Sequence, residues 1–557
     1  MNPSTALARV LVDELARGGV RDAVLSPGSR SAPLAFALDR DDRIRLHVRI
    51  DERSAGFLAL GIAMVSRRPV AVVCTSGTAA ANLHPAVLEA SHAGTSLVVL
   101  TADRPPELRA TGANQTIDQI GLYGGAVRLC ADVGVAEERP GAVNYWRSVT
   151  SRALAVAAQH ADPGPVHLNV ALREPLVPDG NEDWIEPLDG RSDRLQWTQV
   201  WVGEPVRHSL ESILGTTPPM RGAVVVGHGA VDAAAARQLA ETLGWPLLSE
   251  PTGNARAGTH AVPAYPLLLA DPGFASSVRP EAVVVVGKPG LSRSLLGWLA
   301  WADRHVVVDP RLRWADPLRR ADVVVPAVPT AEPRPATDWL QQWLAADVAA
   351  RTAVSAVLDG MVEPSEPRLA RDLVAALPAG ALLLAGSSRP IRDLDAYADA
   401  RADITVIGNR GVSGIDGLIS TTLGASLTHD GPAFALLGDL AMLHDHGGLL
   451  LGPGELRPDV TLVVADNDGG GIFSLLPPAD QPGFDRIFGT PHGLDLAAVA
   501  VAAGWECTVL DRAADLPPAL AGHGPRVVLA RTRREQTAAL HRQLQQDVGA
   551  ALEAQGP

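Results

Sequence analysis

Short apolar runs rich in valine and leucine recur along this chain, and each is followed by a turn and then by a helical pattern. Examples are AVLS at 23–26, AVVCTSG at 71–77 and SLVVLTADRP at 96–105. A run that is apolar at every position is typical of a strand buried on both faces, and such strands alternate with helices in parallel sheets. The pattern therefore predicts an α/β protein built of doubly wound parallel sheets.

Two breaks in this pattern indicate three α/β units. The stretch 179–197 is polar and rich in turn residues, which is typical of a linker, and a second break covers 326–335. Helical sequence then leads to another boundary near 363–367. We predict three domains, over residues 1–180, 200–345 and 363–557.

Composition narrows the class of protein. The net charge of −14 argues against nucleic acid as a main partner. Three cysteines, Cys74, Cys130 and Cys507, lie far apart and in no metal-binding spacing, which favours a reducing cytoplasm. No apolar run approaches the roughly 20 residues of a membrane helix, so no transmembrane segment is expected.

The N-terminal stretch 1–19 lacks the basic region and the long apolar region of a signal peptide. Its apolar residues recur with the spacing of one helix face. We expect an amphipathic helix that buries Leu7, Val10, Leu11 and Leu15.

The strongest chemical signal lies at the ends of two predicted strands in the third unit. FALLGDLAMLHD puts Gly438 and Asp439 at the carboxyl end of one strand, and TLVVADNDGGGIF puts Asn467 and Gly469 after the next. Open α/β sheets bind ligands at that edge. A carboxylate, an amide oxygen and a glycine carbonyl suit Mg²⁺, which takes phosphate oxygens and water as its other ligands. Each segment alone is an ordinary turn, but the pair predicts a metal–phosphate site.

This pair of segments resembles the diphosphate–Mg²⁺ motif of thiamine-diphosphate enzymes. The resemblance implies a pyrimidine-binding domain, a central domain and a diphosphate-binding domain, in the order of the three units. It implies thiamine diphosphate and Mg²⁺, or Mn²⁺ in its place, with Asp439, Asn467 and Gly469 as metal ligands and Gly438 and Ser388 beside the cofactor.

The same resemblance requires a glutamate after a strand of the first domain, in contact with the aminopyrimidine ring of the cofactor. IRLHVRIDERSAGFLALGIA supplies Glu52 at that place. An acid at the start of a helix also has a simpler explanation, because it interacts favourably with the helix dipole.

Five ordered segments narrow the resemblance further: LSPGSRSAPL, TADRPPELRATGANQT, GNRGVSGIDGLIST, GDLAMLHD and NDGGGIFSLLP. Together they resemble the 2-succinyl-5-enolpyruvyl-6-hydroxy-3-cyclohexene-1-carboxylate (SEPHCHC) synthases of menaquinone biosynthesis. The similarity covers the first and third units almost completely and is weaker in the middle unit.

That family decarboxylates 2-oxoglutarate and adds the resulting succinyl-semialdehyde carbanion to isochorismate in a Stetter-like 1,4-addition, which yields SEPHCHC and CO₂. The resemblance therefore implies a transferase in which Glu52 is catalytic, because it holds the pyrimidine ring proton. It also implies that Ile415 bends the cofactor, although an isoleucine of the core would look the same in sequence.

Both substrates are dianions, and guanidinium groups bind carboxylates strongly. By resemblance, the substrate pocket contains Ser29, Arg30, Arg104, Asn114, Gln115, Arg293, Ser388, Arg392 and Arg410, with Ile472 and Phe473 as apolar walls. The resemblance further implies a homo-oligomer, a homodimer or homotetramer, whose active sites lie at the dimer interface.

Three positions depart from the family pattern or stay open. Many relatives have three asparagines where this chain has Asp466-Asn467-Asp468, and the added carboxylates are expected to tighten metal binding or change the choice of metal. Relatives often have Lys-Arg where this chain has Arg293-Ser294, so Arg293 is the weakest member of the pocket. His444 is either a metal ligand or, as we expect, a residue that packs on a helix.

Two alternative functions differ from this one in what they require of the sequence. Another thiamine-diphosphate carboligase or 2-oxo acid decarboxylase would lack SPGSR and GNRGVSGIDG. A non-catalytic cofactor-binding relative would have no reason to keep Glu52 in one domain and Asp439 and Asn467 in another.

Overall fold

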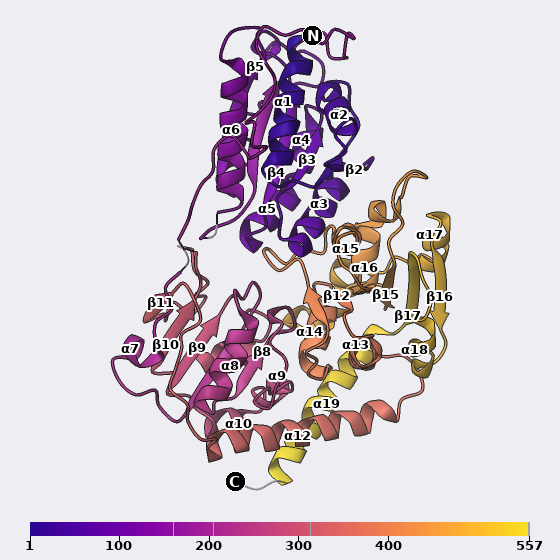
Figure 1. Ribbon diagram of the computed structural model, residues 1–557. Helices are drawn as coiled ribbons and strands as arrows, with labels where there is room; N and C mark the ends of the chain where they lie inside the picture. The colour runs from indigo at the N-terminus through magenta and orange to yellow at the C-terminus, as the bar shows by residue number, and fades with distance from the viewer. Residues whose placement is uncertain (160, 204, 312, 555–557) are drawn as a thin grey trace. The chain divides into compact units, whose positions relative to one another are not determined.

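Three sheets contain the named strands of this computed structural model, and every pair of neighbouring strands in them is parallel. The structure describes residues 1–159, 161–203, 205–311 and 313–554. Helices are interspersed with the strands in all three sheets (Figure 1). The predicted α/β class with doubly wound parallel sheets is confirmed.

Contacts group the chain into two units. Unit 1 comprises Met1–Gly203, Asn409–Asp430 and His444–Pro458. Unit 2 comprises Glu204–Gly408, Gly431–Leu443 and Asp459–Pro557. Two segments of the predicted third domain therefore belong with the first sheet, while the second and third sheets share unit 2.

The first sheet, in unit 1, has six strands in the order β2-β1-β3-β4-β6-β5. The strands are β1 (Asp22–Leu25), β2 (Arg45–Val48), β3 (Val70–Cys74), β4 (Leu97–Asp103), β5 (Leu129–Val135) and β6 (Val166–Ala171). The helices are α1 (Pro3–Arg17), α2 (Ala32–Asp39), α3 (Glu52–Ser66), α4 (Thr78–Asn82), α5 (His84–Ala93) and α6 (Ala142–Ala157). All residues of β1, β3, β4 and β6 are buried, as expected for strands covered on both faces.

The N-terminal helix α1 has the predicted amphipathic pattern. The side chain of Asn2 caps the helix and Pro3 begins it, which are favourable residues at these positions. Its buried face packs with Trp146 and Leu154 of α6 in one apolar cluster. That face contains the four residues predicted for it, Leu7, Val10, Leu11 and Leu15.

Two helices of unit 1 approach each other closely through glycines. Helix α15 (Leu418–Ser426) packs on α3. A Cβ on Gly61 would lie 2.0 Å from the carbonyl oxygen of Thr421, and a Cβ on Gly424 would lie 2.0 Å from that of Leu58. Only glycine permits this approach of the two backbones, so these residues determine how α15 joins unit 1.

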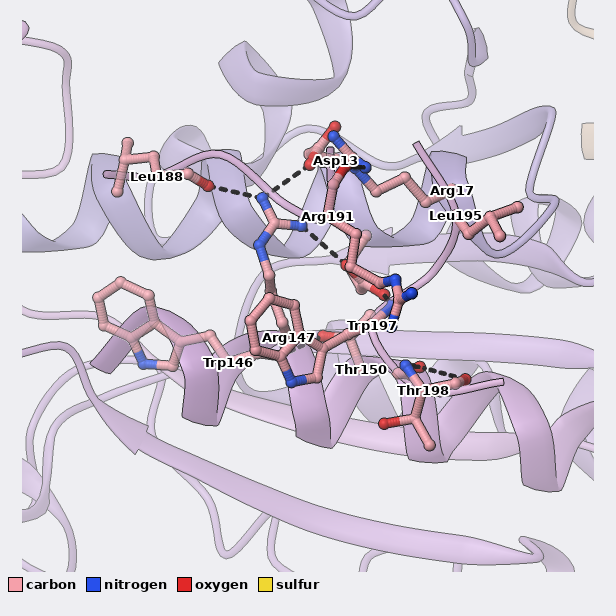
Figure 2. Close-up of polar contacts among 12 residues, drawn as sticks. Asp13, Arg17, Trp146, Arg147, Thr150, Leu188, Arg191, Leu195, Trp197 and Thr198 are labelled. Atoms are coloured by element: carbon pink, nitrogen blue, oxygen red, sulfur yellow. Dashed lines mark hydrogen bonds and ion pairs between the residues drawn. The ribbon is translucent and has the colours of Figure 1, made fainter. Parts of the chain in front are cut away.

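The stretch predicted as a linker is attached to the first sheet's helices by polar contacts (Figure 2). Arg147 of α6 is 1% exposed and forms ion pairs of 2.7 Å with Asp13 and with Glu14, both on α1. The same guanidinium donates to the carbonyl of Leu188 at 2.6 Å, and the N–H of Trp197 donates to Glu14 at 2.5 Å. The linker therefore follows a defined path over α1 and α6.

The second sheet has five strands in the order β11-β10-β9-β7-β8. These are β7 (Gly222–Val226), β8 (Leu247–Ser249), β9 (Ala282–Val286), β10 (Arg304–Val308) and β11 (Val323–Val325). The helices of this part are α7 (Leu210–Leu214), α8 (Ala233–Leu243), α9 (Tyr265–Leu268), α10 (Pro272–Ser277), α11 (Arg293–Leu299) and α12 (Asp338–Asp359).

The third sheet repeats the strand succession of the first, in the order β13-β12-β14-β15-β17-β16. The strands are β12 (Leu382–Ala385), β13 (Thr405–Ile407), β14 (Ala433–Gly438), β15 (Val460–Asp466), β16 (Glu506–Leu510) and β17 (Arg526–Arg531). The helices are α13 (Glu366–Ala376), α14 (Arg389–Tyr397), α16 (Asp439–His444), α17 (Leu496–Ala502), α18 (Leu516–Ala519) and α19 (Arg534–Ala554). Within unit 2, α12 and α19 pack on each other around Trp343 and Leu544 (Figure 1).

The shared strand order places the ligand-binding edge in both sheets. The direction of strand addition reverses beside β1 in one sheet and beside β12 in the other. Doubly wound sheets bind ligands at the carboxyl ends of the strands that flank this reversal.

No helix within the described residues is long and apolar enough to cross a membrane.

Candidate functional site

In unit 2, the predicted metal ligands meet at the carboxyl ends of β14 and β15. These strands are paired so that Gly438 lies opposite Ala465, and the next residues continue into Asp439 and Asn467. One carboxylate oxygen of Asp439 accepts the N–H of Asn467 at 3.1 Å and the N–H of Gly469 at 2.8 Å. The buried carboxylate therefore lies directly beside the loop that follows β15.

Asn467 has one satisfied and one unsatisfied side of its amide. Its Nδ2 donates to Oε1 of Glu366 at 2.7 Å. Its Oδ1 is buried and has no hydrogen-bond partner among the described residues. A buried polar atom without a partner is costly, and such atoms in native structures often mark a bound ion or water.

Two glycines of this edge matter for different reasons. One stands where a side chain would clash, and the other leaves space that a side chain would fill. Gly469 has a φ of +137°, and a Cβ there would lie 1.9 Å from the carbonyl oxygen of Gly489. Its own carbonyl accepts the N–H of Gly471 at 3.0 Å, which leaves a second lone pair. A Cβ on Gly438 would meet nothing within 4 Å among the described residues, so the space beside the strand end is open.

Electrostatics at this edge favour a cation. Burial, together with the negative charge of Asp466, raises the pKa of Asp439 to about 6. Asp439, Asp466 and His492 each place one possible ligand atom within 4.8 Å of the others. A divalent cation would compensate the buried carboxylate of Asp439, whose charged form is otherwise disfavoured.

His492 belongs to this cluster, although no local sequence motif points to it. Its Nε2 lies 3.5 Å from a carboxylate oxygen of Asp439 and 3.8 Å from one of Asp466. This nitrogen is also buried without a hydrogen-bond partner among the described residues. The other candidate histidine, His444, is exposed and ends α16, and its carbonyl accepts a hydrogen bond from Arg53.

The two extra carboxylates of the motif have different surroundings. Asp466 faces the cluster with Asp439 and His492. Asp468 is half-exposed, and one of its oxygens accepts the N–H groups of His492 and Gly493 at 2.9 and 2.8 Å. Asp466 can therefore affect the metal directly, whereas Asp468 holds the loop that carries His492.

Next to this edge, the turn after β12 carries Ser388 and leads into α14. Ser388 has a φ of 76°, which is unusual for a residue with a side chain and is often associated with functional sites. Its carbonyl accepts a hydrogen bond of 2.8 Å from Arg392, one turn further along α14.

The remaining predicted residues of unit 2 lie on two other segments. Ile472 and Phe473 are half-buried in the short 3-10 helix η5 (Gly471–Leu475), which directly follows the metal loop. The Phe473 ring lies 5.4 Å from that of Phe488, centre to centre. Arg293 is exposed at the start of α11, on the second sheet.

In unit 1, Glu52 is the first residue of α3, the helix that follows β2, which is the place predicted for it. It is half-buried, and the preceding Asp51 caps the helix by accepting the N–H of Arg53 at 2.9 Å. Burial, and after it the charge of Glu52, raises the pKa of Cys74, the last residue of β3. The Glu52 carboxylate therefore lies near the carboxyl end of β3, at the ligand-binding edge of the first sheet.

Two arginines lie near each other at the same edge. Arg30 follows β1 and donates to the carbonyl of Leu172 at 3.0 Å, and Arg104 follows β4 and donates to the hydroxyl of Ser76. Burial and the charge of Arg30 lower the pKa of the Arg104 guanidinium. Two like charges at a partly buried edge form a suitable site for a doubly charged anion.

The polar residues predicted beside these arginines lie on loops of the same unit. Gln115 donates to the carbonyl of Ser76 at 3.0 Å, and the Ser76 hydroxyl donates back to the carbonyl of Gln115 at 3.0 Å. Asn114 and Ser29 are exposed on the adjoining loops.

The loop 409–417 brings Arg410 and Ile415 into unit 1. Glu89 of α5 accepts the N–H groups of Gly411 and Val412 at 2.6 and 2.8 Å and so holds the loop. Arg410 is buried and Ile415 is half-buried. Unit 1 thus contains Ser29, Arg30, Glu52, Arg104, Asn114, Gln115, Arg410 and Ile415, and unit 2 contains the other predicted residues.

The residues of unit 2 fit thiamine diphosphate and a divalent cation. Asn467 presents a buried oxygen that lacks a partner, Asp439 presents a buried carboxylate, and Gly438 leaves open space beside them. Hard oxygen donors of this kind suit Mg²⁺ or Mn²⁺, which retain positions for phosphate oxygens.

Comparison with known proteins agrees with this chemistry. The family model described as the thiamine pyrophosphate enzyme N-terminal TPP-binding domain matches residues 5–122. The chain is similar to the SEPHCHC synthase of Thermobifida fusca, with 58% identity over 99% of this chain and 100% of that protein. It is also similar to those of Saccharopolyspora erythraea (51% identity, 99% and 100% covered) and Nocardia farcinica (45%, 97% and 98%).

Proposed function

Because the chain belongs to the family of SEPHCHC synthases, which are thiamine-diphosphate enzymes of menaquinone biosynthesis, we propose that it catalyses the reaction of that name. The enzyme decarboxylates 2-oxoglutarate and joins the remaining four-carbon unit to isochorismate by a Stetter-like 1,4-addition. The observation that carries the proposal is the edge of the third sheet, where a buried carboxylate and a buried amide oxygen without a partner lie beside open space.

At that edge Asp439, Asn467 and the carbonyl of Gly469 would hold Mg²⁺, or Mn²⁺ in its place, and through it the diphosphate of the cofactor. Bound thiamine diphosphate supplies a nucleophilic carbon and an electron sink for the decarboxylation. The backbone at Gly438 and at Ser388 would lie close to the cofactor, because Gly438 has no side chain and Ser388 begins the turn into α14. Ile415 is assigned as the apolar residue against which the cofactor bends.

Glu52 is proposed as the catalytic acid of the first sheet's edge. Its carboxylate holds a proton on the ring nitrogen of the aminopyrimidine, and this role needs a side chain that is protected from water yet accessible from the site. The half-buried position of Glu52 at the start of α3 is suited to it. General acid–base groups of this kind contribute about 10²–10⁴ in rate.

The arginines are proposed to bind the substrate carboxylates. Arg30 and Arg104 form the dianion site of unit 1, with Ser29, Asn114 and Gln115 as hydrogen-bonding neighbours. Arg392, Arg410 and Arg293 complete the set, and Ile472 and Phe473 form its apolar walls. Charge-assisted, bidentate hydrogen bonds make arginine the preferred residue for such ligands.

We further propose a homo-oligomer, a homodimer or homotetramer, in which each active site lies at the interface of two subunits. Glu52 and Asp439 belong to different units of the chain, which is compatible with such a composite site. We infer a cytoplasmic location from the three free cysteines.

The proposal is tested by product analysis. Purified protein is incubated with thiamine diphosphate, Mg²⁺, 2-oxoglutarate and isochorismate, and the product is identified by mass while CO₂ is measured. We expect SEPHCHC and CO₂ in equal amounts. CO₂ release from pyruvate but not from 2-oxoglutarate would indicate another carboligase or decarboxylase, and cofactor binding without CO₂ from any 2-oxo acid would indicate a non-catalytic relative.

A further inference from the structure

Glu366 lies behind the proposed metal site and is not among the residues assigned above. It begins α13 and is 4% exposed. Its Oε1 accepts the Nδ2–H of Asn467 at 2.7 Å, and it is also 3.3 Å from the hydroxyl of Thr532 and 3.4 Å from that of Thr537. One carboxylate oxygen thus links the loop after β15 to the start of α19.

This hydrogen bond determines which way the Asn467 amide faces. An amide has a donor side and an acceptor side, whereas a carboxylate only accepts. The NH₂ group of Asn467 must therefore face Glu366, and Oδ1 must face the other way. That oxygen is the buried atom without a partner among the described residues. Glu366 therefore defines the direction of Oδ1, although no described residue pairs with this oxygen.

We propose that Glu366 is a positioning residue, which holds the amide of Asn467 so that Oδ1 is presented to the cation. The inference rests on the proposed function, because it requires a cation bound beside Asp439. Glu366 itself does not touch the cation. Groups that orient metal ligands from behind typically contribute 10–100-fold to metal affinity.

A purely structural role for Glu366 makes a different prediction. Glu366 also receives hydrogen bonds from Thr532 and Thr537, so removing it weakens the attachment of α13 to the start of α19. Such a loss would lower the melting temperature but would leave the affinity for a cation nearly unchanged in the folded protein. Metal affinity therefore separates the two roles.

The test compares three variants of the full-length protein with the wild type. Glu366→Leu removes the acceptor and replaces it with an apolar side chain of similar size. Glu366→Gln keeps an acceptor oxygen at the same place. Thr537→Val removes a hydrogen bond to the same carboxylate and leaves that of Asn467 in place. Mn²⁺ binding in the presence of thiamine diphosphate is measured from the electron paramagnetic resonance signal of free Mn²⁺, and circular dichroism checks the fold.

We expect Glu366→Leu to weaken Mn²⁺ binding about 10–100-fold. Glu366→Gln should recover most of that loss, and Thr537→Val should bind as the wild type does. Wild-type affinity in Glu366→Leu overturns the inference, as does equal loss in Glu366→Leu and Thr537→Val. If Glu366→Leu does not fold, a Gln variant with a tenfold or greater loss overturns orientation as the cause. A wild-type protein that binds no Mn²⁺ overturns the proposed metal site itself.

Discussion

At the scale of single residues, two carboxylates at the same edge of the third sheet have different partners. Asp439 is buried and accepts backbone N–H groups of the loop after β15, while Asp468 points to the backbone of the segment that carries His492. Burial removes the water that would stabilise a charge, so the Asp439 carboxylate needs a cation more than the Asp468 carboxylate does.

Replacing Asp439 or Asn467 by alanine should abolish retention of the cofactor. Each change removes one of few protein ligands from an ion that tolerates little geometric error. Calorimetric titration of thiamine diphosphate in the presence of Mg²⁺ measures the effect. Asp468→Asn is the matched control, because it keeps an acceptor for the N–H groups of His492 and Gly493 and should retain the cofactor. Wild-type affinity in Asp439→Ala would place the metal elsewhere.

Replacing Arg392 or Arg410 by alanine should raise the KM of a substrate and lower kcat, with cofactor binding intact. Hydrogen bonds to a desolvated charged group contribute about 1.5–3 kcal/mol, or roughly ten- to a hundredfold. Steady-state kinetics with each substrate varied in turn identifies the carboxylate that each arginine binds. Arg293→Ala, an exposed arginine of the second sheet, should have the smallest effect of the three. Unchanged kinetics in both main variants would contradict the proposed pocket.

At the scale of elements, two packing details of unit 1 depend on particular side chains. Arg147 joins α6 to α1 through ion pairs with Asp13 and Glu14, and the segment 188–198 is attached to the same groups by hydrogen bonds. Gly61 and Gly424 allow α3 and α15 to meet with their backbones close together. The first detail relies on charge and the second on the absence of a side chain.

Arg147→Met should lower the free energy of unfolding of unit 1 by about 3–5 kcal/mol, because it leaves the buried Glu14 carboxylate without its ion-pair partner. Differential scanning calorimetry should show the corresponding transition at lower temperature. Arg191→Ala removes an exposed ion pair with Asp193 on the same segment and should have little effect. Equal shifts of the unfolding temperature in both variants would mean that the buried ion pair contributes no more to stability than the exposed one.

Gly61→Ala should destabilise the packing of α3 on α15, because its Cβ would meet the backbone oxygen of Thr421 at 2.0 Å. Overpacking of this kind costs about 1–3 kcal/mol. Gly297→Ala in α11 is the control, since a Cβ there meets nothing within 4 Å among the described residues, and it should stabilise its helix by about 0.5–1 kcal/mol. Calorimetric unfolding gives both signs. A stabilised Gly61→Ala would contradict the close approach.

At the scale of the whole molecule, the candidate residues divide between two units that each present the carboxyl edge of a sheet. The first and third sheets share one strand order, so equivalent edges carry Glu52 in one and Asp439 in the other. In the proposed mechanism both residues act at one cofactor. The proposed homo-oligomer supplies them from two subunits.

Mixing two inactive variants tests that arrangement. Glu52→Gln should lose about 10²–10⁴ in rate, and Asp439→Ala should lose the cofactor. In a mixed dimer with composite sites, one site carries both lesions and the other carries neither. Co-expressed variants should therefore regain up to about a quarter of the wild-type activity, as random pairing and independent sites require. Mixed dimers that are as inactive as their parents would contradict an interfacial site.

The sequence by itself determined the strands that are apolar at every position, because burial on both faces requires that pattern. The runs that begin at Ala23, Ala71 and Leu97 lie in β1, β3 and β4. The edge strands β5 and β16 were not predicted, since one side of each faces water and their residues are mixed. The central strand β6 was also missed, because its buried His167 and Asn169 interrupt the apolar run.

The candidate site shows the same division. Asp439 and Asn467 follow neighbouring strands of the sheet, so the motif alone predicted that they lie at one edge. Glu366 and His492 reach that edge from α13 and from a distant loop, and no local pattern connects them to it. The sequence indicated only a domain boundary near 363–367, where Glu366 is in fact buried. Contacts between residues far apart in sequence depend on how the helices pack on the sheet, and only the tertiary structure decides that.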